Sequence, residues 1–253
     1  MSSTKVALVT GGSRGLGRNT ALALAQAGMD VIFTYRTEKS LAHEVEREIE
    51  RLGRKAASLQ LDVADRSTFQ TFIANVRQAL TDMGGRSAID VLVNNAGSGA
   101  KAAFADTTEE MFDQMMDVHL KGMFFLTQAM LPILADSGRI VNLSSGLARF
   151  TFPGYSAYAV MKGGIEVLTR YLAKELGTRG ITVNTVAPGA IETDFGGGDV
   201  RDNPNLKKAV AEQTALGRVG VPDDIGPLIA SLVSESGRWV NGQRIEASGG
   251  IFL

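Results

Sequence analysis

The sequence of 253 residues contains no cysteine and only two histidines, His43 and His119. Without cysteine, the chain has no disulfides, no thiolate chemistry and no cysteine-ligated metal site. Two histidines also argue against the histidine-rich ligand sets that hold catalytic zinc. The sequence therefore predicts no metal centre.

The chain also lacks an excess of charge of either sign, because 26 lysines and arginines face 27 acidic residues. A protein that binds nucleic acid usually carries a basic excess, so we expect no nucleic-acid partner. No apolar run approaches the roughly 20 residues of a membrane span. The run from Lys5 to Thr10 is too short for the core of a signal peptide. We therefore expect a cytoplasmic protein without membrane contact.

Short apolar runs, by contrast, recur along the whole chain and alternate with segments of helical periodicity. This alternation predicts a parallel, doubly wound α/β sheet in a single domain over residues 1–253. Gly138 is expected to precede the fifth of the runs. The predicted strands are Val6–Val9, Val31–Tyr35, Ala56–Leu61, Ile89–Val93, Ile140–Leu143, Ile181–Ala187 and Gln243–Ala247.

Residues 194–205 lose this periodicity and contain three consecutive glycines, Gly196–Gly198. A glycine-hinged segment beyond the carboxyl end of a strand is a candidate lid. We expect residues 194–205 to form a mobile loop, as part of a substrate lid around residues 190–215.

A glycine-rich turn, Thr10–Gly17, follows the first predicted strand and opens a helix. Glycines let backbone N–H groups approach an anion, and the helix dipole favours negative charge at its amino end. The turn therefore predicts a nucleotide phosphate site. The second strand ends at Tyr35-Arg36 without a carboxylate before Glu38, and Arg14 can reach the same region. Two guanidiniums favour NADP over NAD, unless Arg36 is merely a solvated residue at the end of its strand.

Polar residues also follow the third and fourth predicted strands. Asp62-Val63 ends the third strand, where the carboxylate could accept a hydrogen bond from an adenine amino group or could serve as a turn or capping residue. Asn94–Gly97 ends the fourth, where the asparagines could fix backbone groups, contact the adenosine or form a turn.

Tyr158 and Lys162 are one helical turn apart, so their side chains share a face. A neighbouring cation lowers the pKa of a phenol, and Tyr158 could then act in general acid–base catalysis. Ser145 ends the fifth predicted strand, where open α/β sheets bind ligands. By itself the Tyr/Lys spacing is also compatible with an ordinary surface pair. His119 lies on the apolar face of a helix, as a packing histidine or as a functional one.

Taken together, these motifs resemble the short-chain dehydrogenase/reductase family over nearly the full chain, particularly its 3-oxoacyl-acyl-carrier-protein reductase and ketoreductase branch. The resemblance implies a Rossmann-type sheet of about seven strands, a nicotinamide cofactor and a homotetramer. It rests on Thr10–Gly17, Asp62-Val63, Asn94–Gly97, Ser145, Tyr158 with Lys162, and Pro188-Gly189 with Thr193.

The resemblance also implies roles for single residues. Ser145 would hold a carbonyl oxygen, Tyr158 would protonate it, and Lys162 would bind the nicotinamide ribose. His119 stands where the family often has an asparagine that feeds a proton relay, so we expect an altered relay. The implied contacts to NADP(H) are Gly11, Ser13, Arg14, Gly15, Leu16, Gly17, Tyr35, Arg36, Asp62, Val63, Asn95, Ala96, Gly97, Tyr158, Lys162, Pro188, Gly189, Ile191 and Thr193.

The function expected from the sequence is an NADPH-dependent reduction of a ketone or aldehyde to an alcohol. The substrate would be a small carbonyl compound or an acyl thioester on a carrier. The alternative is an NADP-binding module that senses or scaffolds without catalysis. Such a module has no need of an acid, so the Ser145, Tyr158 and Lys162 set favours the enzyme.

Overall fold

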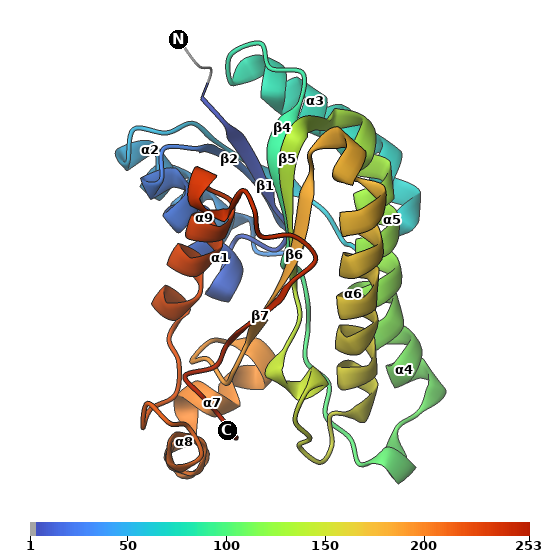
Figure 1. The fold of residues 1–253 in the computed structure, drawn as a ribbon, viewed down its shortest axis with the longest axis vertical. Coiled ribbons are helices and arrows are strands. Elements are labelled where there is room, and N and C mark those ends of the chain that lie inside the picture. Colours follow the sequence, from blue (N-terminus) through green and yellow to red (C-terminus); the bar gives the residue numbers. More distant parts are fainter. Residues whose placement is uncertain (1–3) are drawn as a thin grey trace.

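The structure is a computed structural model that describes residues 4–253. Seven strands form one parallel sheet in the order β3-β2-β1-β4-β5-β6-β7 (Figure 1). The order reverses between β1 and β4, which is where an open α/β sheet has its ligand crevice. The strands are β1 (Val6–Val9), β2 (Asp30–Tyr35), β3 (Ala56–Gln60), β4 (Ile89–Asn94), β5 (Leu134–Leu143), β6 (Thr182–Pro188) and β7 (Arg244–Ala247).

Helices connect the strands and cover both faces of the sheet (Figure 1). A π-helical turn, Asp117–Lys121, joins α4 to α5. The helices are α1 (Gly15–Gln26), α2 (Lys39–Arg51), α3 (Phe69–Asp82), α4 (Glu109–Met116), α5 (Gly122–Met130), α6 (Ser156–Glu175), α7 (Asp199–Asp202), α8 (Pro204–Glu212) and α9 (Gly226–Leu232).

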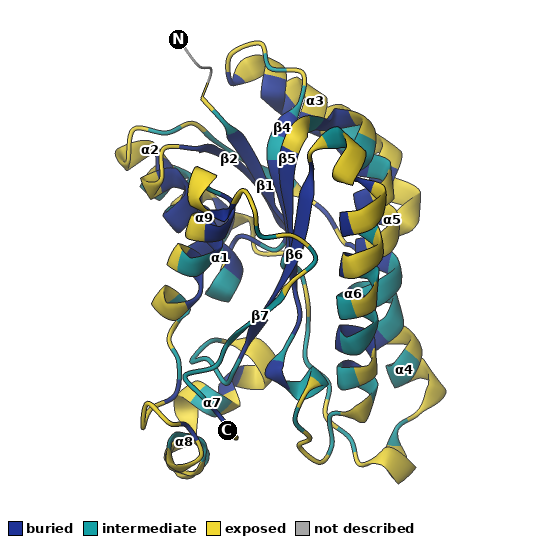
Figure 2. Ribbon diagram, viewed as in Figure 1, coloured by how far each residue is buried: buried dark blue, intermediate teal, exposed yellow. Residues whose placement is uncertain are grey.

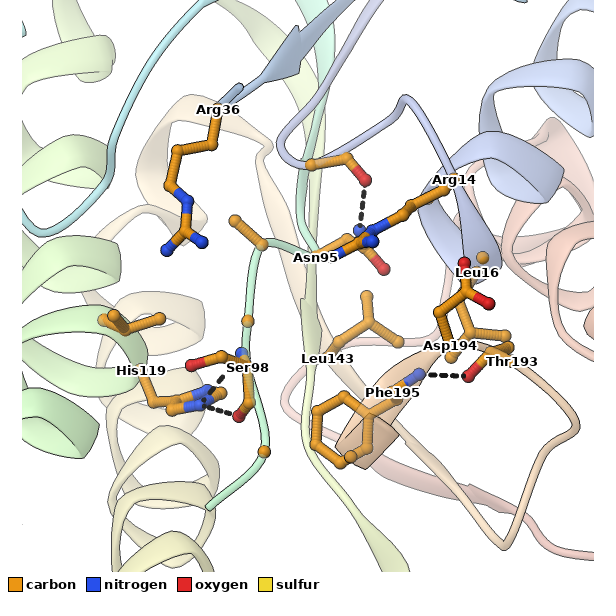
Figure 3. A pocket seen from close by; sticks show the side chains of 18 of the residues that line it. Arg14, Leu16, Arg36, Asn95, Ser98, His119, Leu143, Thr193, Asp194 and Phe195 are labelled. Atoms are coloured by element: carbon orange, nitrogen blue, oxygen red, sulfur yellow. Dashed lines mark hydrogen bonds between the residues drawn. The ribbon is translucent and has the colours of Figure 1, made fainter. Parts of the chain in front are cut away.

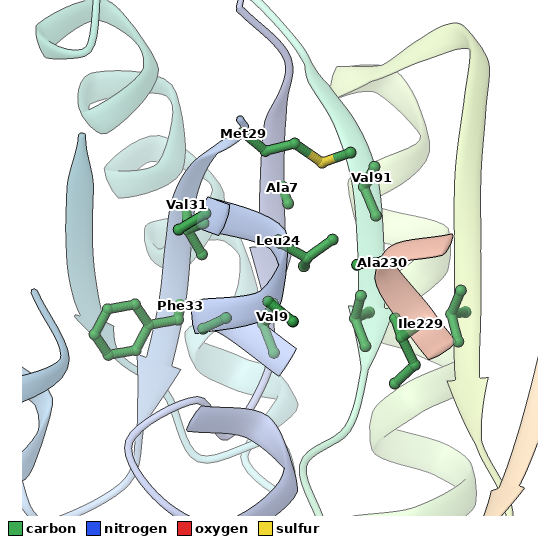
Figure 4. Close-up of a cluster of buried hydrophobic side chains, with 14 of the residues drawn as sticks. Ala7, Val9, Leu24, Met29, Val31, Phe33, Val91, Ile229 and Ala230 are labelled. Carbon is green, nitrogen blue, oxygen red and sulfur yellow. The ribbon is translucent and has the colours of Figure 1, made fainter. Parts of the chain in front are cut away.

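Alternate residues of each central strand enter two different cores, because successive side chains of a strand point to opposite faces. Val9 and Phe33 pack with α1, α2 and α9 on one face (Figure 4). Leu8 and Ile32 pack with α3, α5 and α6 on the other face. The central strands are buried throughout (Figure 2), as expected when helices cover both faces of a parallel sheet. The predicted doubly wound fold is therefore confirmed.

Two local predictions are wrong. Strand β5 begins at Leu134 and includes Gly138, because a register shift lets Leu134 pair with Ile89 before regular pairing resumes. Exposed polar residues near the start of β5 interrupt its apolar run, so the apolar pattern indicates only the second half of the strand. The segment expected to be a loop carries α7 and the beginning of α8, which Asn203 caps with its side chain. None of the described helices has the length and apolar character needed to cross a membrane.

Candidate active site

A cavity of about 440 Å³ lies at the carboxyl ends of the strands (Figure 3). It extends from the glycine turn after β1 to the amino end of α6 and the segment after β6. Every predicted catalytic residue lines it, and so does every predicted cofactor contact except Tyr35. Tyr35 is buried in the core beneath α1 and α2, because its side chain points away from the cavity at the end of β2.

The glycine turn leads into the amino end of α1, where the sequence predicts a phosphate site. The first backbone N–H groups of a helix have no partner within the helix and can bind a phosphate. A side chain at Gly17 would place its Cβ 2.1 Å from the Gly11 carbonyl oxygen, so only glycine fits there. Asn95 braces the turn by donating from Nδ2 to the Thr10 and Gly11 carbonyl oxygens, at 2.8 and 3.1 Å. The structure thus gives Asn95 the backbone-fixing role that the sequence left open.

Arg14 extends into the cavity from the glycine turn, and Arg36 extends into it from the end of β2 (Figure 3). Neither guanidinium makes an ion pair or hydrogen bond with another described residue, although Glu38 also lines this end. By contrast, the neighbouring Arg18 binds both carboxylate oxygens of Glu48, at 2.8 and 2.7 Å. Two unpaired guanidiniums at the adenosine end suit an additional phosphate, which they can grip through several charge-assisted bonds.

The polar residues that end β3 and β4 serve structural roles as well. Asp62 lines the cavity and accepts a hydrogen bond from the Ala64 backbone N–H at 2.9 Å, as a turn residue does. Asn94 is buried and donates from Nδ2 to Thr127 on α5 and to Asn142 on β5, both at 2.9 Å. These bonds fix the helix and the strand that flank the predicted catalytic residues.

Ser145, Tyr158 and Lys162 meet at the other end of the cavity. Tyr158 and Lys162 lie on the first two turns of α6. Ser145 lies two residues after Leu143, the last residue of β5. The Lys162 Nζ lies 5.4 Å from the centre of the Tyr158 ring and donates to the Leu143 carbonyl oxygen at 2.7 Å. Both side chains are buried. The predicted catalytic set is therefore assembled on the predicted nucleotide cavity.

Burial dominates the acid–base properties of this pair. It raises the pKa of the Tyr158 phenol above its usual value, while a side-chain hydrogen bond with Ser145 works in the opposite direction. It also lowers the pKa of Lys162 to about 7, because burial removes the water that would hydrate the charged amine. The expected lowering of the Tyr158 pKa by Lys162 is thus wrong for the protein by itself. A phenol with a raised pKa stays protonated at neutral pH and remains able to donate its proton.

His119 lies in the π-helical turn, with its ring buried against Tyr158. Such turns are uncommon within α-helices and often occur at functional sites. The Nε2 atom lies 2.7 Å from the Ser98 carbonyl oxygen and 3.4 Å from the Ser98 backbone nitrogen (Figure 3). Because the shorter contact is to an oxygen that can only accept, we assign the proton to Nε2, which donates to the carbonyl oxygen. Burial, together with the charge of Lys162, lowers the pKa of His119 to about 3. His119 is therefore neutral, with a bare Nδ1 that is buried and has no partner among the described residues.

Phe195, which begins the segment after Asp194, closes the cavity over Tyr158. The two ring centres are 5.6 Å apart, and a Cβ at Gly99 would lie 3.1 Å from the Phe195 ring. The Phe195 backbone N–H donates to the Thr193 hydroxyl at 3.2 Å (Figure 3). The Thr193 hydroxyl keeps its own proton free for a second bond. One threonine thereby connects the predicted cofactor contacts to the aromatic ring that covers the tyrosine.

Some lining residues had no sequence signal that pointed to them. Ser98 and Val118 line the cavity between β4 and the π-helical turn. Ser98 contributes its backbone carbonyl oxygen, which accepts a hydrogen bond from His119. A backbone contact of this kind does not depend on residue type, so the sequence does not reveal it. The Gly97 position does carry a signal: a Cβ there would lie 2.8 Å from the His119 ring, so the glycine makes room for the imidazole.

A family model described as Enoyl-(Acyl carrier protein) reductase matches residues 11–251 of the chain. The chain is 40% identical to the short-chain dehydrogenase/reductase FrzI of Cladobotryum sp over 252 residues, which cover 98% of this chain and 95% of FrzI. It is 37% identical to the 3-oxoacyl-[acyl-carrier-protein] reductase FabG of Staphylococcus aureus (strain Mu50 / ATCC 700699), with both chains covered completely (100%). The landomycin C-6 ketoreductase LanV, solved with bound NADP and rabelomycin, superposes with a TM-score of 0.89 at 38% identity, covering 98% of this chain and 96% of LanV.

Proposed function

Because the chain belongs to the short-chain dehydrogenase/reductase family, we propose that it is an NADPH-dependent reductase that converts a ketone or aldehyde to an alcohol. The observation that carries the proposal is the presence of Ser145, Tyr158 and Lys162 in one cavity with the glycine turn. A hydrogen-bonding hydroxyl, a protonated phenol and a buried amine at the end of a nucleotide cradle suit carbonyl reduction.

The residues of the cavity fit a nicotinamide dinucleotide. Gly17 keeps the backbone of α1 accessible to a pyrophosphate, and Arg14 with Arg36 would hold the 2′-phosphate that distinguishes NADP from NAD. The Thr193 hydroxyl and the Ile191 backbone would hold the carboxamide. The cofactor, when bound, supplies the hydride. The bound NADP of LanV supports this choice of cofactor.

Tyr158 acts as the general acid in the proposed reaction. The Ser145 hydroxyl donates to the carbonyl oxygen and holds it next to the phenol, which transfers its proton as negative charge develops on that oxygen. The raised pKa of Tyr158 keeps the phenol protonated before the reaction. The proton transfer remains favourable because an alkoxide is a much stronger base than a phenolate.

Lys162 and His119 both contact the Tyr158 ring and assist the proposed acid. Lys162 uses one N–H for the Leu143 carbonyl oxygen, so its remaining hydrogens are available to the ribose hydroxyls of the cofactor. His119 and Lys162 both line a small internal cavity of about 10 Å³. The bare Nδ1 of His119 can accept a hydrogen bond on this side, which suits the altered relay expected where the family often has an asparagine.

The proposed substrate is a ketone with apolar surroundings, either a small molecule or a 3-oxoacyl thioester. Phe195 lies over Tyr158, and Phe152 lies 6.3 Å from the Tyr155 ring at the amino end of α6. These rings would offer apolar contact near the proposed position of the reacting carbonyl. The names of FabG and LanV support a ketone of one of these two kinds.

We also propose that the enzyme works as a homotetramer. Large apolar side chains are exposed on the outer faces of α5 and α6, where a second copy would cover them. They are Phe124 and Phe125 on α5, and Val160, Val167 and Tyr171 on α6. Light scattering on a sizing column measures the oligomeric state, and a monomer at micromolar concentration would refute this part of the proposal.

The test of the function is NADPH oxidation, followed by absorbance, over a panel of acyl thioesters, diketones, quinones, sugars and aldehydes. Turnover of at least one ketone or aldehyde with a matching amount of alcohol product is expected. Tight NADPH binding without turnover on the whole panel would instead favour the non-catalytic sensor or scaffold.

A further inference from the structure

Glu166 continues the catalytic face of α6. It lies one helical turn beyond Lys162 and two turns beyond Tyr158, so the three side chains follow one stripe of the helix. Its side chain is only 15% exposed. The Oε1 atom accepts a hydrogen bond from the Ser144 hydroxyl at 2.7 Å and another from Arg244 Nε at 2.7 Å. One carboxylate on α6 thus holds the end of β5 and the start of β7.

Arg244 uses all three guanidinium nitrogens on different partners. Nε donates to Glu166, and Nη1 donates to Glu246 Oε2 at 2.8 Å. Nη2 donates to the Ser145 carbonyl oxygen at 3.3 Å. The planar guanidinium fixes these directions relative to one another, which an ammonium group could not do. Arg244 therefore connects the catalytic serine to the helix that carries the catalytic tyrosine.

This connection matters because Ser145 and Tyr158 lie on different elements but must reach the same carbonyl oxygen. We propose that Glu166 and Arg244 are positioning residues that hold Ser145 in place against Tyr158. The inference rests on the proposed function, since it assigns a role in that carbonyl reduction. A displacement of about 1 Å in such a constellation can cost about a hundredfold in rate.

The hydrogen bonds of Glu166 and Arg244 hold the serine segment and lie outside the cofactor contacts. Neither Glu166 nor Arg244 lines the nucleotide cavity, so their loss leaves the phosphate and adenosine contacts in place. Glu246 is held from its other side by Arg149, whose Nε and Nη2 each donate to it at 2.7 Å. Without Arg244, Glu166 would keep only the Ser144 hydroxyl, and the Ser145 carbonyl would lose its side-chain donor.

The experiment compares Arg244→Met with Arg179→Met. Arg179 is a matched control, because it also joins a carboxylate, Asp136, to backbone carbonyl oxygens, those of Leu131 and Leu134. It lies at the amino end of β5, opposite to the cavity. Both variants lose a bridging arginine, so both are expected to lower the melting temperature. Only Arg244→Met is expected to lower kcat, by about tenfold or more, with an unchanged KM for NADPH.

Hydrogen–deuterium exchange of the full-length variants provides a readout that does not need turnover. Residues 144–150 should exchange faster in Arg244→Met than in the wild type, and at the wild-type rate in Arg179→Met. Wild-type kcat in Arg244→Met, or unchanged exchange in this segment, would overturn the inference. Absence of turnover by the wild type would refute the proposed function instead, while the exchange result would still decide whether Arg244 holds the serine segment.

Glu166→Gln serves as a second variant of nearly the same shape, which is useful if Arg244→Met does not fold. It keeps an oxygen for Ser144 and loses the charge that Arg244 needs. In the double variant with Arg244→Met, the losses in kcat should be less than multiplicative, because both changes break one connection. Multiplicative losses would show two independent effects and contradict a shared positioning role.

Discussion

The His119 ring stands edge-on against the Tyr158 ring, with the ring centres 5.1 Å apart and the planes at 90°. The imidazole is thus both a packing partner of the proposed acid and a neighbour of Lys162, whose charge helps to lower its pKa. The sequence left open whether His119 is a packing residue or a functional one, and this contact is compatible with both roles. A histidine that stays neutral here can orient the phenol and accept a hydrogen bond without bringing a second charge into the site.

The pKa of His119 gives a prediction about acid stability. The unfolded chain binds a proton on this histidine near pH 6.5, whereas the folded chain does so only near pH 3. Stability is therefore lost as the pH falls from 6.5 toward 3, because protons favour the unfolded state. His119→Asn should remove about 3 kcal/mol of the wild-type loss in unfolding free energy between pH 7 and pH 4. Urea unfolding at both pH values measures this.

The exposed His43, which is paired with Glu46, provides the control for this experiment. His43→Asn should leave the large pH-dependent loss in place. The pH profile of kcat tests the role in catalysis: with a pKa of about 3, His119 should add no inflection between pH 5 and 8. Unchanged turnover and an unchanged pH profile in His119→Asn would remove any special role for the imidazole in the relay.

The second prediction concerns the acid itself. Tyr158→Phe keeps the ring that packs against His119 and Phe195 but removes the proton. It should lower kcat at least a hundredfold, or about 2.7 kcal/mol of transition-state stabilisation, with NADPH binding almost unchanged. Steady-state NADPH oxidation and a fluorescence titration of NADPH measure the two quantities.

Tyr171→Phe removes a hydroxyl group from the outer face of the same helix, away from the cavity, and keeps the ring for the proposed subunit contact, so it should retain wild-type turnover. If Tyr158→Phe reduced ketones at a near-normal rate, Tyr158 would not be the acid.

The sequence was sufficient to predict the seven-strand fold and the segments that supply most of the cavity wall, for a physical reason. Strand, glycine turn and helix start are local patterns, and the topology of a parallel sheet brings the carboxyl ends of its strands to one edge. Gly11, Ser145 and Lys162 could therefore be placed in one site from their positions in the chain alone.

The failures of the sequence analysis depend on side-chain direction and on burial. Tyr35 adjoins Arg36, but successive residues of a strand point to opposite sides, so only the arginine reaches the cavity. The pKa of Tyr158 depends on how completely the fold removes water around it, which residue spacing does not reveal. Arg244 is distant in sequence from its partner Glu166, and its role could be recognised only from the assembled fold.

The third prediction is that the buried charge of Lys162 lowers the free energy of unfolding of the wild type at neutral pH. Its pKa of about 7 in the folded chain, against 10.5 for an ordinary lysine, means that folding favours its neutral form. Protons then favour the unfolded state between pH 7 and 10.5, and wild-type stability rises there by about 1.4 kcal/mol per pH unit from this residue alone. Lys162→Met should therefore be more stable than the wild type at pH 7, with a smaller advantage at pH 9, and should be inactive.

Urea unfolding at pH 7 and pH 9 checks this, with Lys174→Met as the control, since Lys174 is an exposed lysine of the same helix. Equal changes in the two variants would show that burial does not penalise the charge of Lys162.

The fourth prediction concerns cofactor choice, because Arg14 and Arg36 line the cavity and neither forms an ion pair within residues 4–253. Arg36→Asp replaces a cation at the cavity wall by an anion, which would repel the 2′-phosphate of NADPH and accept hydrogen bonds from the ribose hydroxyls of NADH. Loss of a charge-assisted bond costs about 1.5–3 kcal/mol, so the ratio of kcat/KM for NADPH to that for NADH should fall by about 10- to 100-fold.

Arg47→Asp makes the same charge change at an exposed position of α2 outside the cavity, and it should leave the ratio close to that of the wild type. Equal use of NADPH and NADH by the unmodified protein would contradict the role given to Arg14 and Arg36. A shift of similar size in both variants would point to the overall field of the protein, because a change of net charge alone then alters the preference. A shift confined to Arg36→Asp would locate the discrimination at the guanidinium, since Arg36 lines the cavity and Arg47 does not.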